Sequence, residues 1–164
     1  MENTLKTMHL AIKSCKKKTI GEPASLEFIK NVEDYMGVKF PTSYKEYLRA
    51  YGWAEIYGNY FFGIGLNIPS IFNLPEISLD EHTIMQPVMP MHLIPVLNDG
   101  AGNHYCLDTS HYDGLNECKI AFWDHELNSD PSWPIEIMFY SYGEFIIHKI
   151  NKWKEWFDND SEKR

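Results

Sequence analysis

The chain has 164 residues, of which 44% are apolar and 15% aromatic, so it is long enough for one domain with a single core. No apolar run approaches the ~20 residues that a membrane span needs, and residues 1–18 lack the apolar centre of a secretory signal peptide. The three cysteines, at positions 15, 106 and 118, cannot all pair with one another and form no C-x-x-C motif. We therefore expect a cytoplasmic, single-domain protein without disulfides or a cysteine zinc site.

The net charge of −8 is unevenly distributed along the chain. Residues 50–148 contain thirteen Asp and Glu but only one basic residue, Lys119, which gives this segment a charge of −12. Residues 1–20 carry five lysines against Glu2 and have a charge of +4. Because phosphates would be repelled by the acidic middle, nucleic acid is not expected as a partner, whereas a basic protein is. The alternative is that the acidity only keeps the protein soluble.

Apolar residues at intervals of three and four predict three helices in the first third of the chain. The first covers residues 5–15 and ends at a run of lysines, and the second covers residues 25–37 between Ser25 and Gly37. Ser43 and Glu46 have the spacing of a capping box, which predicts a third helix that ends at Gly52.

The rest of the chain has mainly the short period of strands. Strands are predicted at residues 54–57, 60–62, 93–97, 104–107 and 118–123. Residues 66–90 contain four prolines and no sustained period, so we expect a loop there with a turn or two of helix. A second capping box, Ser141 with Glu144, opens a final helix.

These elements predict an α+β fold in which a largely antiparallel β-sheet is flanked by N-terminal and C-terminal helices. We divide the chain into a basic helix or arm at residues 1–20, the domain at residues 21–157 and a polar tail at residues 158–164.

Two groups of residues could carry chemistry. His104 and Cys106 would share a face of their strand, with Asp108 beyond them, and imidazole and thiolate both bind zinc. Two or three such residues do not complete a zinc site, so a histidine packed on the sheet is the favoured interpretation.

Asp124-His125-Glu126 could supply a general base to a small hydrolase. Since no nucleophile motif accompanies it, we expect no enzyme activity, metal or cofactor.

Three segments, in this order, resemble motifs of the SUKH superfamily, which includes fungal cell-wall-synthesis regulators and bacterial toxin-immunity proteins. Residues 40–53 (FPTSYKEYLRAYGW) are similar to its "LP..Y..FL...G" helix, with Phe40 in place of the usual Leu. Residues 94–108 (IPVLNDGAGNHYCLD) are similar to "I.....G.G..Y.LD", and residues 120–126 (IAFWDHE) to "V..WDHE". The proline-rich residues 66–90 match no motif.

The resemblance implies a non-catalytic α+β protein that binds a toxin and neutralises it inside the producing cell. Such an immunity protein could occlude a cognate polymorphic or secreted toxin, such as a basic nuclease domain, with an acidic surface. A regulatory scaffold of the cell-wall-regulator type is the alternative.

Candidate residues follow from these interpretations. For toxin contact we expect acidic and aromatic residues of loops and strand ends: Glu55, Tyr57, Asp80, Glu81, Asp113, Glu117, Asp124, Glu126 and Asp130. The motif residues have structural roles to offer, in turns, helix ends and packing: Pro41, Gly52, Gly100, Gly102, Asp108 and Trp123.

Overall fold

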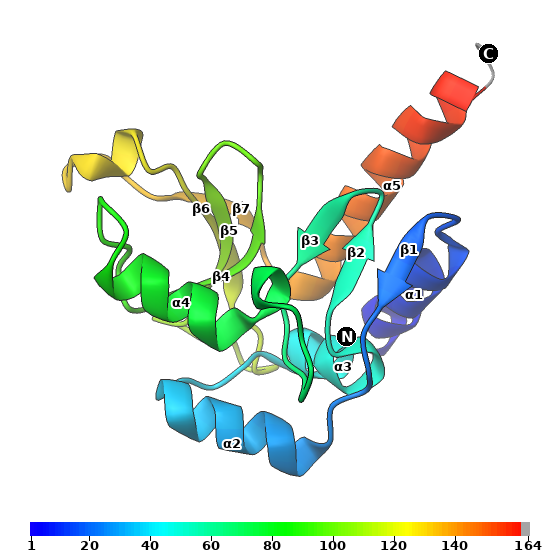
Figure 1. The fold of residues 1–164 in the computed structure, drawn as a ribbon, viewed down its shortest axis with the longest axis horizontal. Helices are drawn as coiled ribbons and strands as arrows, with labels where there is room; N and C mark the ends of the chain where they lie inside the picture. Colours follow the sequence, from blue (N-terminus) through cyan, green and yellow to red (C-terminus); the bar gives the residue numbers. More distant parts are fainter. Residues whose placement is uncertain (162–164) are drawn as a thin grey trace.

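The computed structural model describes residues 1–161, which form five α-helices, two short 3-10 helices and seven strands (Figure 1). The helices are α1 (Glu2–Ser14), α2 (Leu26–Met36), α3 (Thr42–Tyr51), η1 (Ser70–Phe72), α4 (Leu74–Thr83), η2 (Leu127–Ser129) and α5 (Tyr142–Ser161). The strands are β1 (Lys18–Ile20), β2 (Ala54–Ile56), β3 (Asn59–Phe61), β4 (Leu93–Asn98), β5 (His104–Asp108), β6 (Lys119–Trp123) and β7 (Glu136–Phe139). The expected polar tail overlaps the end of α5, and its residues 162–164 lie outside the described part.

The seven strands form one sheet in which neighbours in space are neighbours in the chain, from β1 to β7, and every pair is antiparallel. This confirms the predicted α+β fold with an antiparallel sheet. The ladder between β3 and β4 consists of one pair, Phe61 opposite Leu97. The outer strands β1 and β7 were not predicted, because both are short and largely exposed and so lack an apolar pattern.

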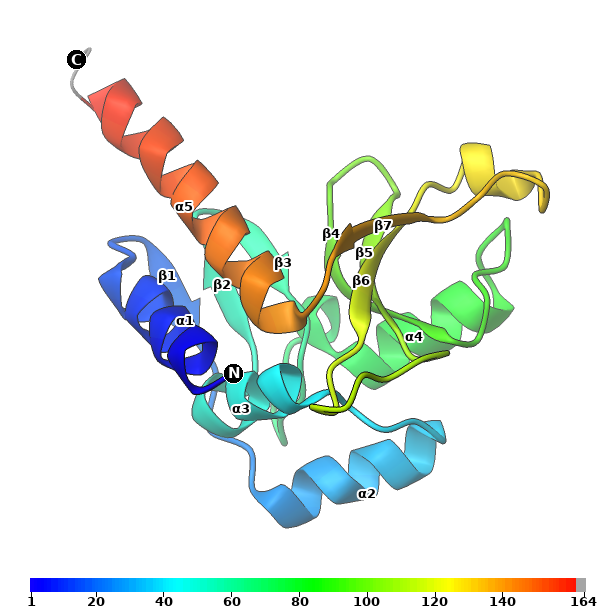
Figure 2. The same ribbon diagram turned by 180° about the vertical axis from the view of Figure 1, so that it is seen from behind.

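Helices cover the two faces of the sheet from opposite sides. Helix α4 lies on one face beside β4, and α5, with α1 packed against it, lies on the other (Figures 1 and 2). Successive residues of a strand point to opposite faces, so His104 faces α4 whereas Tyr105 faces α5, where its ring lies 5.2 Å from that of Phe145. Alternate residues of these strands therefore face α4 and α5.

A cluster of tyrosines joins α3 to α5 in the core. The rings of Tyr44 and Tyr142 lie 4.7 Å apart, edge to face, and both side chains are fully buried. The hydroxyl of Tyr44 donates to the carbonyl of Phe62 at 2.9 Å, which satisfies its polar end. This cluster fixes the helix of the first motif against the sheet.

Two of the three predicted caps occur in the structure. Ser25 Oγ accepts from Phe28 N, and Ser141 Oγ accepts from Glu144 N. The capping box of Ser43 was wrong: Pro41 takes the N-cap position of α3, which places Ser43 inside its first turn. Proline is favoured where a helix begins because the first N–H groups of a helix have no partner within it.

The segment 66–90 was expected to be mostly loop, but it contains the three-turn helix α4. Its apolar residues do not form one stripe: Leu74 is buried, whereas Leu79 and Ile84, close to its end, are exposed. Among the described residues, no helix has both the length and the apolar character to cross a membrane.

Candidate functional site

A cleft of about 570 Å³ opens between α4 and the hairpin of β4 and β5, and we call it the α4 cleft. Helix α4 and the loop after it form one wall, β3 and the hairpin form the other, and the segment after β6 closes one end. Its lining consists of Tyr60, Phe62, Ile71, Ile77, Asp80, Glu81, Met85, Gln86, Pro87, Asn98, Gly100, Gly102, His104 and His125. The cleft thus combines apolar side chains with two carboxylates and two imidazoles.

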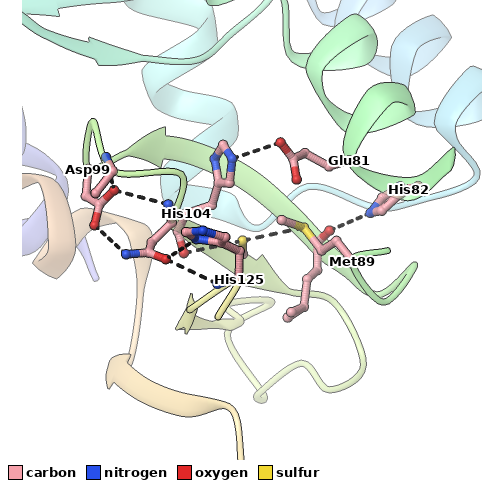
Figure 3. A network of polar contacts seen from close by, with 10 residues as sticks. Glu81, His82, Met89, Asp99, His104 and His125 are labelled. Atoms are coloured by element: carbon pink, nitrogen blue, oxygen red, sulfur yellow. Dashed lines mark hydrogen bonds and ion pairs between the residues drawn. The ribbon is translucent and has the colours of Figure 1, made fainter. Parts of the chain in front are cut away.

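His104 and Glu81 form a buried pair in this cleft. The His104 Nε2 lies 3.0 Å from the Glu81 Oε1, and their side chains are only 7% and 13% exposed (Figure 3). Since a carboxylate only accepts, Nε2 carries the proton of this bond. The other ring nitrogen, Nδ1, is buried without a hydrogen-bond partner in residues 1–161.

His125 is held by the turn between β4 and β5. Asn103 Nδ2 donates to Asp99 Oδ2, so the amide oxygen of Asn103 points to His125, where it lies 2.8 Å from Nδ1 (Figure 3). This oxygen also accepts from the His125 backbone N–H. His125 Nδ1 therefore donates, and its Nε2 is left as an acceptor.

The turn itself is shaped by Asp99 and two glycines. Although burial opposes ionisation, hydrogen bonds from the N–H of Ala101 and from Asn103 hold the pKa of Asp99 below its ordinary value. Gly100 and Gly102 both have positive φ, and a Cβ at Gly102 would lie 3.0 Å from the His125 ring. Glycine at 102 therefore lets the imidazole lie against the turn.

Cys106 lies on the same face as His104 but does not make a metal site. Its thiol is fully buried against Met89 at 3.9 Å, and burial, with Glu81 nearby, raises its pKa well above the ordinary value. Asp108 accepts from Ser110 N and Oγ instead. Within the described residues, no three His, Cys, Asp or Glu are placed to hold a metal ion.

Two of the expected contact residues line the α4 cleft, and three more lie in the chain segment around and after His125. Asp80 and Glu81 line it, and Asp124, Glu126 and Asp130 belong to the segment that contains or follows His125. Asp124 Oδ1 accepts from the N–H groups of Glu126 and Leu127, so this carboxylate caps the turn of η2 and is not paired with His125. The segment Asp124-His125-Glu126 therefore forms a turn.

Two other expected contact residues are not among the residues that line the cleft. Glu55 is half-buried in β2, opposite Thr19 and Tyr60 of the neighbouring strands. Asp113 lies between β5 and β6, where its Oδ1 accepts from Leu115 N and Glu117 N.

Tyr57 and Glu117 were wrongly expected at the surface. Tyr57 is buried, with its ring stacked 4.8 Å from that of Phe157. Glu117 is buried against α3, where Oε1 accepts from Ser43 N and Oε2 from Ser43 Oγ, both at 2.7 Å. Burial raises the pKa of Glu117, while the bonds from Ser43 partly oppose that rise. This carboxylate joins distant parts of the chain.

The remaining motif residues occupy structural positions. Gly52 ends α3 at a positive φ, and a Cβ there would lie 2.2 Å from the Glu22 carbonyl oxygen. Trp123 is buried in β6. The close approach of two backbones thus explains the glycine at position 52, and the packing of the indole in the core explains Trp123.

The sequence interpretation missed the apolar rim of the α4 cleft. Ile71 and Met85 line the cleft although they are 55% and 50% exposed, and Val88 and Met91 after α4 are also exposed. Apolar residues in a proline-rich segment give no sign that they are exposed, so no pattern in the sequence could have identified this rim.

A family model matches residues 26–146, which include the α4 cleft: SUKH_6, described as SMI1-KNR4 cell-wall. The chain belongs to this SUKH family. It is also similar to the "SPbeta prophage-derived uncharacterized protein YokK" of Bacillus subtilis (strain 168). The two are 22% identical over the matched region, which covers 77% of this chain and 74% of the relative.

Proposed function

We propose that the protein is an immunity protein that binds a cognate bacterial toxin through the α4 cleft and its surroundings and so blocks the toxin's active site. The observation that carries the proposal is the mixed surface at this cleft, in a chain of the SUKH family. Exposed apolar residues, Ile71 and Met85, lie beside carboxylates, Asp80 and Glu81. An exposed apolar patch with charged neighbours is typical of a protein interface.

The charge of this surface favours a basic partner. No Lys or Arg is among the residues that line the cleft, and the segment from 50 to 148 has a charge of −12. Opposite charge accelerates encounter and selects partners, so a toxin with a basic active-site groove, such as a nuclease, fits this side. We infer that the protein acts in the cytoplasm of the cell that makes the toxin.

Binding without catalysis is the function that the polar groups support. The Asp124 carboxylate is used by backbone N–H groups of its own turn, and His125 Nδ1 by Asn103. Asn103 orients His125, but a general base also needs a nucleophile to activate, and no Ser, Thr or Cys is among the residues that line the cleft. The regulatory scaffold remains the alternative, because the matching family is described by cell-wall proteins.

Co-expression tests the proposal. The toxin domain encoded beside this gene should arrest growth of a sensitive bacterial host, and the wild-type chain should restore it. The Asp80→Lys variant reverses an exposed charge in the cleft, and Glu136→Lys reverses an exposed charge on β7 as a matched control. We expect Asp80→Lys to slow association roughly 3- to 10-fold at low salt, and Glu136→Lys to have little effect. Failure of the wild-type chain to bind any neighbouring toxin would contradict the proposal.

A further inference from the structure

We propose that the α4 cleft binds the guanidinium group of an arginine side chain of the partner, with its aliphatic stem against the apolar wall. This inference rests on the proposed function for the partner, but it concerns the chemistry of the cleft itself. It follows from an imbalance of acceptors and donors, from one buried acceptor without a partner, and from the shape and composition of the walls.

The carboxylates and imidazoles of the cleft offer mainly acceptors, whereas the amides of Gln86 and Asn98 and the hydroxyl of Tyr60 can both donate and accept. Glu81 uses Oε1 for His104, and in the described chain its Oε2 and the Asp80 carboxylate carry no hydrogen bond. His125 Nε2 is an acceptor because Nδ1 donates to Asn103. The side chains that line the cleft offer two carboxylates and no fixed positive charge. A ligand that satisfies these groups must bring several N–H donors and a positive charge.

His104 supplies a second, independent observation. The residue is 6% exposed, lines the cleft, and has its Nδ1 buried without a partner. Since Nε2 donates to Glu81, a neutral His104 leaves an unsatisfied acceptor at Nδ1. An unsatisfied buried polar atom is costly and uncommon, so a donor that reaches this part of the cleft is favoured.

The walls favour arginine over lysine. The aromatic rings of Tyr60 and Phe62 and the side chains of Ile71 and Met85 line the cleft around the acceptors. A guanidinium is planar, carries five donors, is weakly hydrated and packs against aromatic faces, whereas an ammonium is a compact, strongly hydrated charge. The combination of apolar walls with several separated acceptors therefore suits a guanidinium on an aliphatic stem.

The test uses small probes in place of a partner. Three small probes are titrated into the full chain, and the backbone amide signals of the protein are followed by NMR. The probes are N-acetyl-arginine amide, its neutral isostere N-acetyl-citrulline amide, and N-acetyl-lysine amide. We expect the arginine probe to shift Gly100 and Gly102, which line the cleft, and to leave Gly37 and Gly58 unchanged. Equal binding of the citrulline or lysine probe, or the absence of shifts at the cleft, would overturn the proposal.

Variants on one helix connect the binding to Glu81. Glu81→Gln keeps an oxygen that can accept from His104 but removes the charge, and Glu76→Gln makes the same change at an exposed position of α4 outside the cleft. We expect Glu81→Gln to weaken the arginine probe about tenfold and Glu76→Gln to leave it unchanged. Equal affinity for wild type and Glu81→Gln would overturn the proposal. Because these probes need no toxin, their failure is distinguishable from a failure to neutralise one.

Discussion

The α5 face of the sheet and its α4 face are built from alternate residues of the same strands, yet they are packed very differently. On the α5 face, Phe145 contacts the rings of Phe61, Tyr105 and Phe139, and Lys149 covers Tyr105. On the α4 face, a smaller buried cluster of Met89, Leu93, Cys106, Ala121 and Trp123 lies beside the open cleft, and Glu81 and His82 of α4 bond to the hairpin across it. The difference gives the larger share of the packed core to the α5 face and leaves part of the α4 face open for binding.

The largest expected effect is on the α5 face. Phe145→Ala removes a fully buried ring and should lower the free energy of unfolding by about 3–5 kcal/mol, measured by urea denaturation. Trp156→Ala removes an exposed indole from the same helix and should change it by no more than about 0.5 kcal/mol. Similar losses in the two variants would contradict the assignment of stability to this face.

A second, smaller effect concerns Lys149 and pH. Its Nζ lies 3.6 Å from the centre of the Tyr105 ring; burial, with Lys152 nearby, lowers the Lys149 pKa from 10.5 to about 8. In this range the unfolded chain binds more protons than the folded one, so this residue's contribution to stability increases as pH rises from about 8 towards 10.5.

Lys149→Met tests that contribution. The free energy of unfolding of the wild type should rise relative to that of the variant when both are denatured at increasing pH between 8 and 10.5. If the difference in free energy of unfolding between wild type and variant stayed constant across this pH range, Lys149 would have the same pKa in the folded and unfolded states, which would contradict the prediction. Lys6→Met, at an exposed position of α1, serves as the control.

The smallest effect on stability is expected at the rim of the α4 cleft. Ile71→Ser should change the free energy of unfolding by no more than about 0.5 kcal/mol because the side chain is already exposed. If this rim contacts a toxin, the same change should weaken binding by about 1–2 kcal/mol, measured by calorimetry. Leu26→Ser, at an exposed position of α2 outside the cleft, should leave binding unchanged. A marked loss of stability in Ile71→Ser would contradict the comparison of the two faces.

Sequence patterns predicted the α5 face better than the α4 face, for a physical reason. Packed elements repeat apolar residues at the period of their structure, so the periodicity identified α1, α2, α3, α5 and the strands from β2 to β6. Helix α4 escaped because Pro75 lies at its start, more prolines follow it, and its apolar residues include exposed ones. A helix that is not packed along one stripe has no clear period.

The candidate site was predicted only in part. His104 and His125 were recognised as notable, but with the wrong neighbours: Cys106 for the first and Asp124 for the second. The actual partners are Glu81, which comes from the missed helix, and Asn103, which lies in a turn 22 residues away. Contacts between elements depend on how those elements pack, and residue spacing along one strand carries no information about it.

The order of the strands has a consequence for how the chain folds. Each strand pairs with the strand before it, and the sheet closes short stretches of chain except at two places: β1 pairs with β2 across α2 and α3, and a single pair connects β3 to β4 across α4. The contact between α1 and α5, by contrast, joins two helices that are separated by all the other elements of the chain. Since closing a long loop is slow, the docking of α5 onto α1 is expected to be the final step, and during synthesis it must wait until the last helix has left the ribosome.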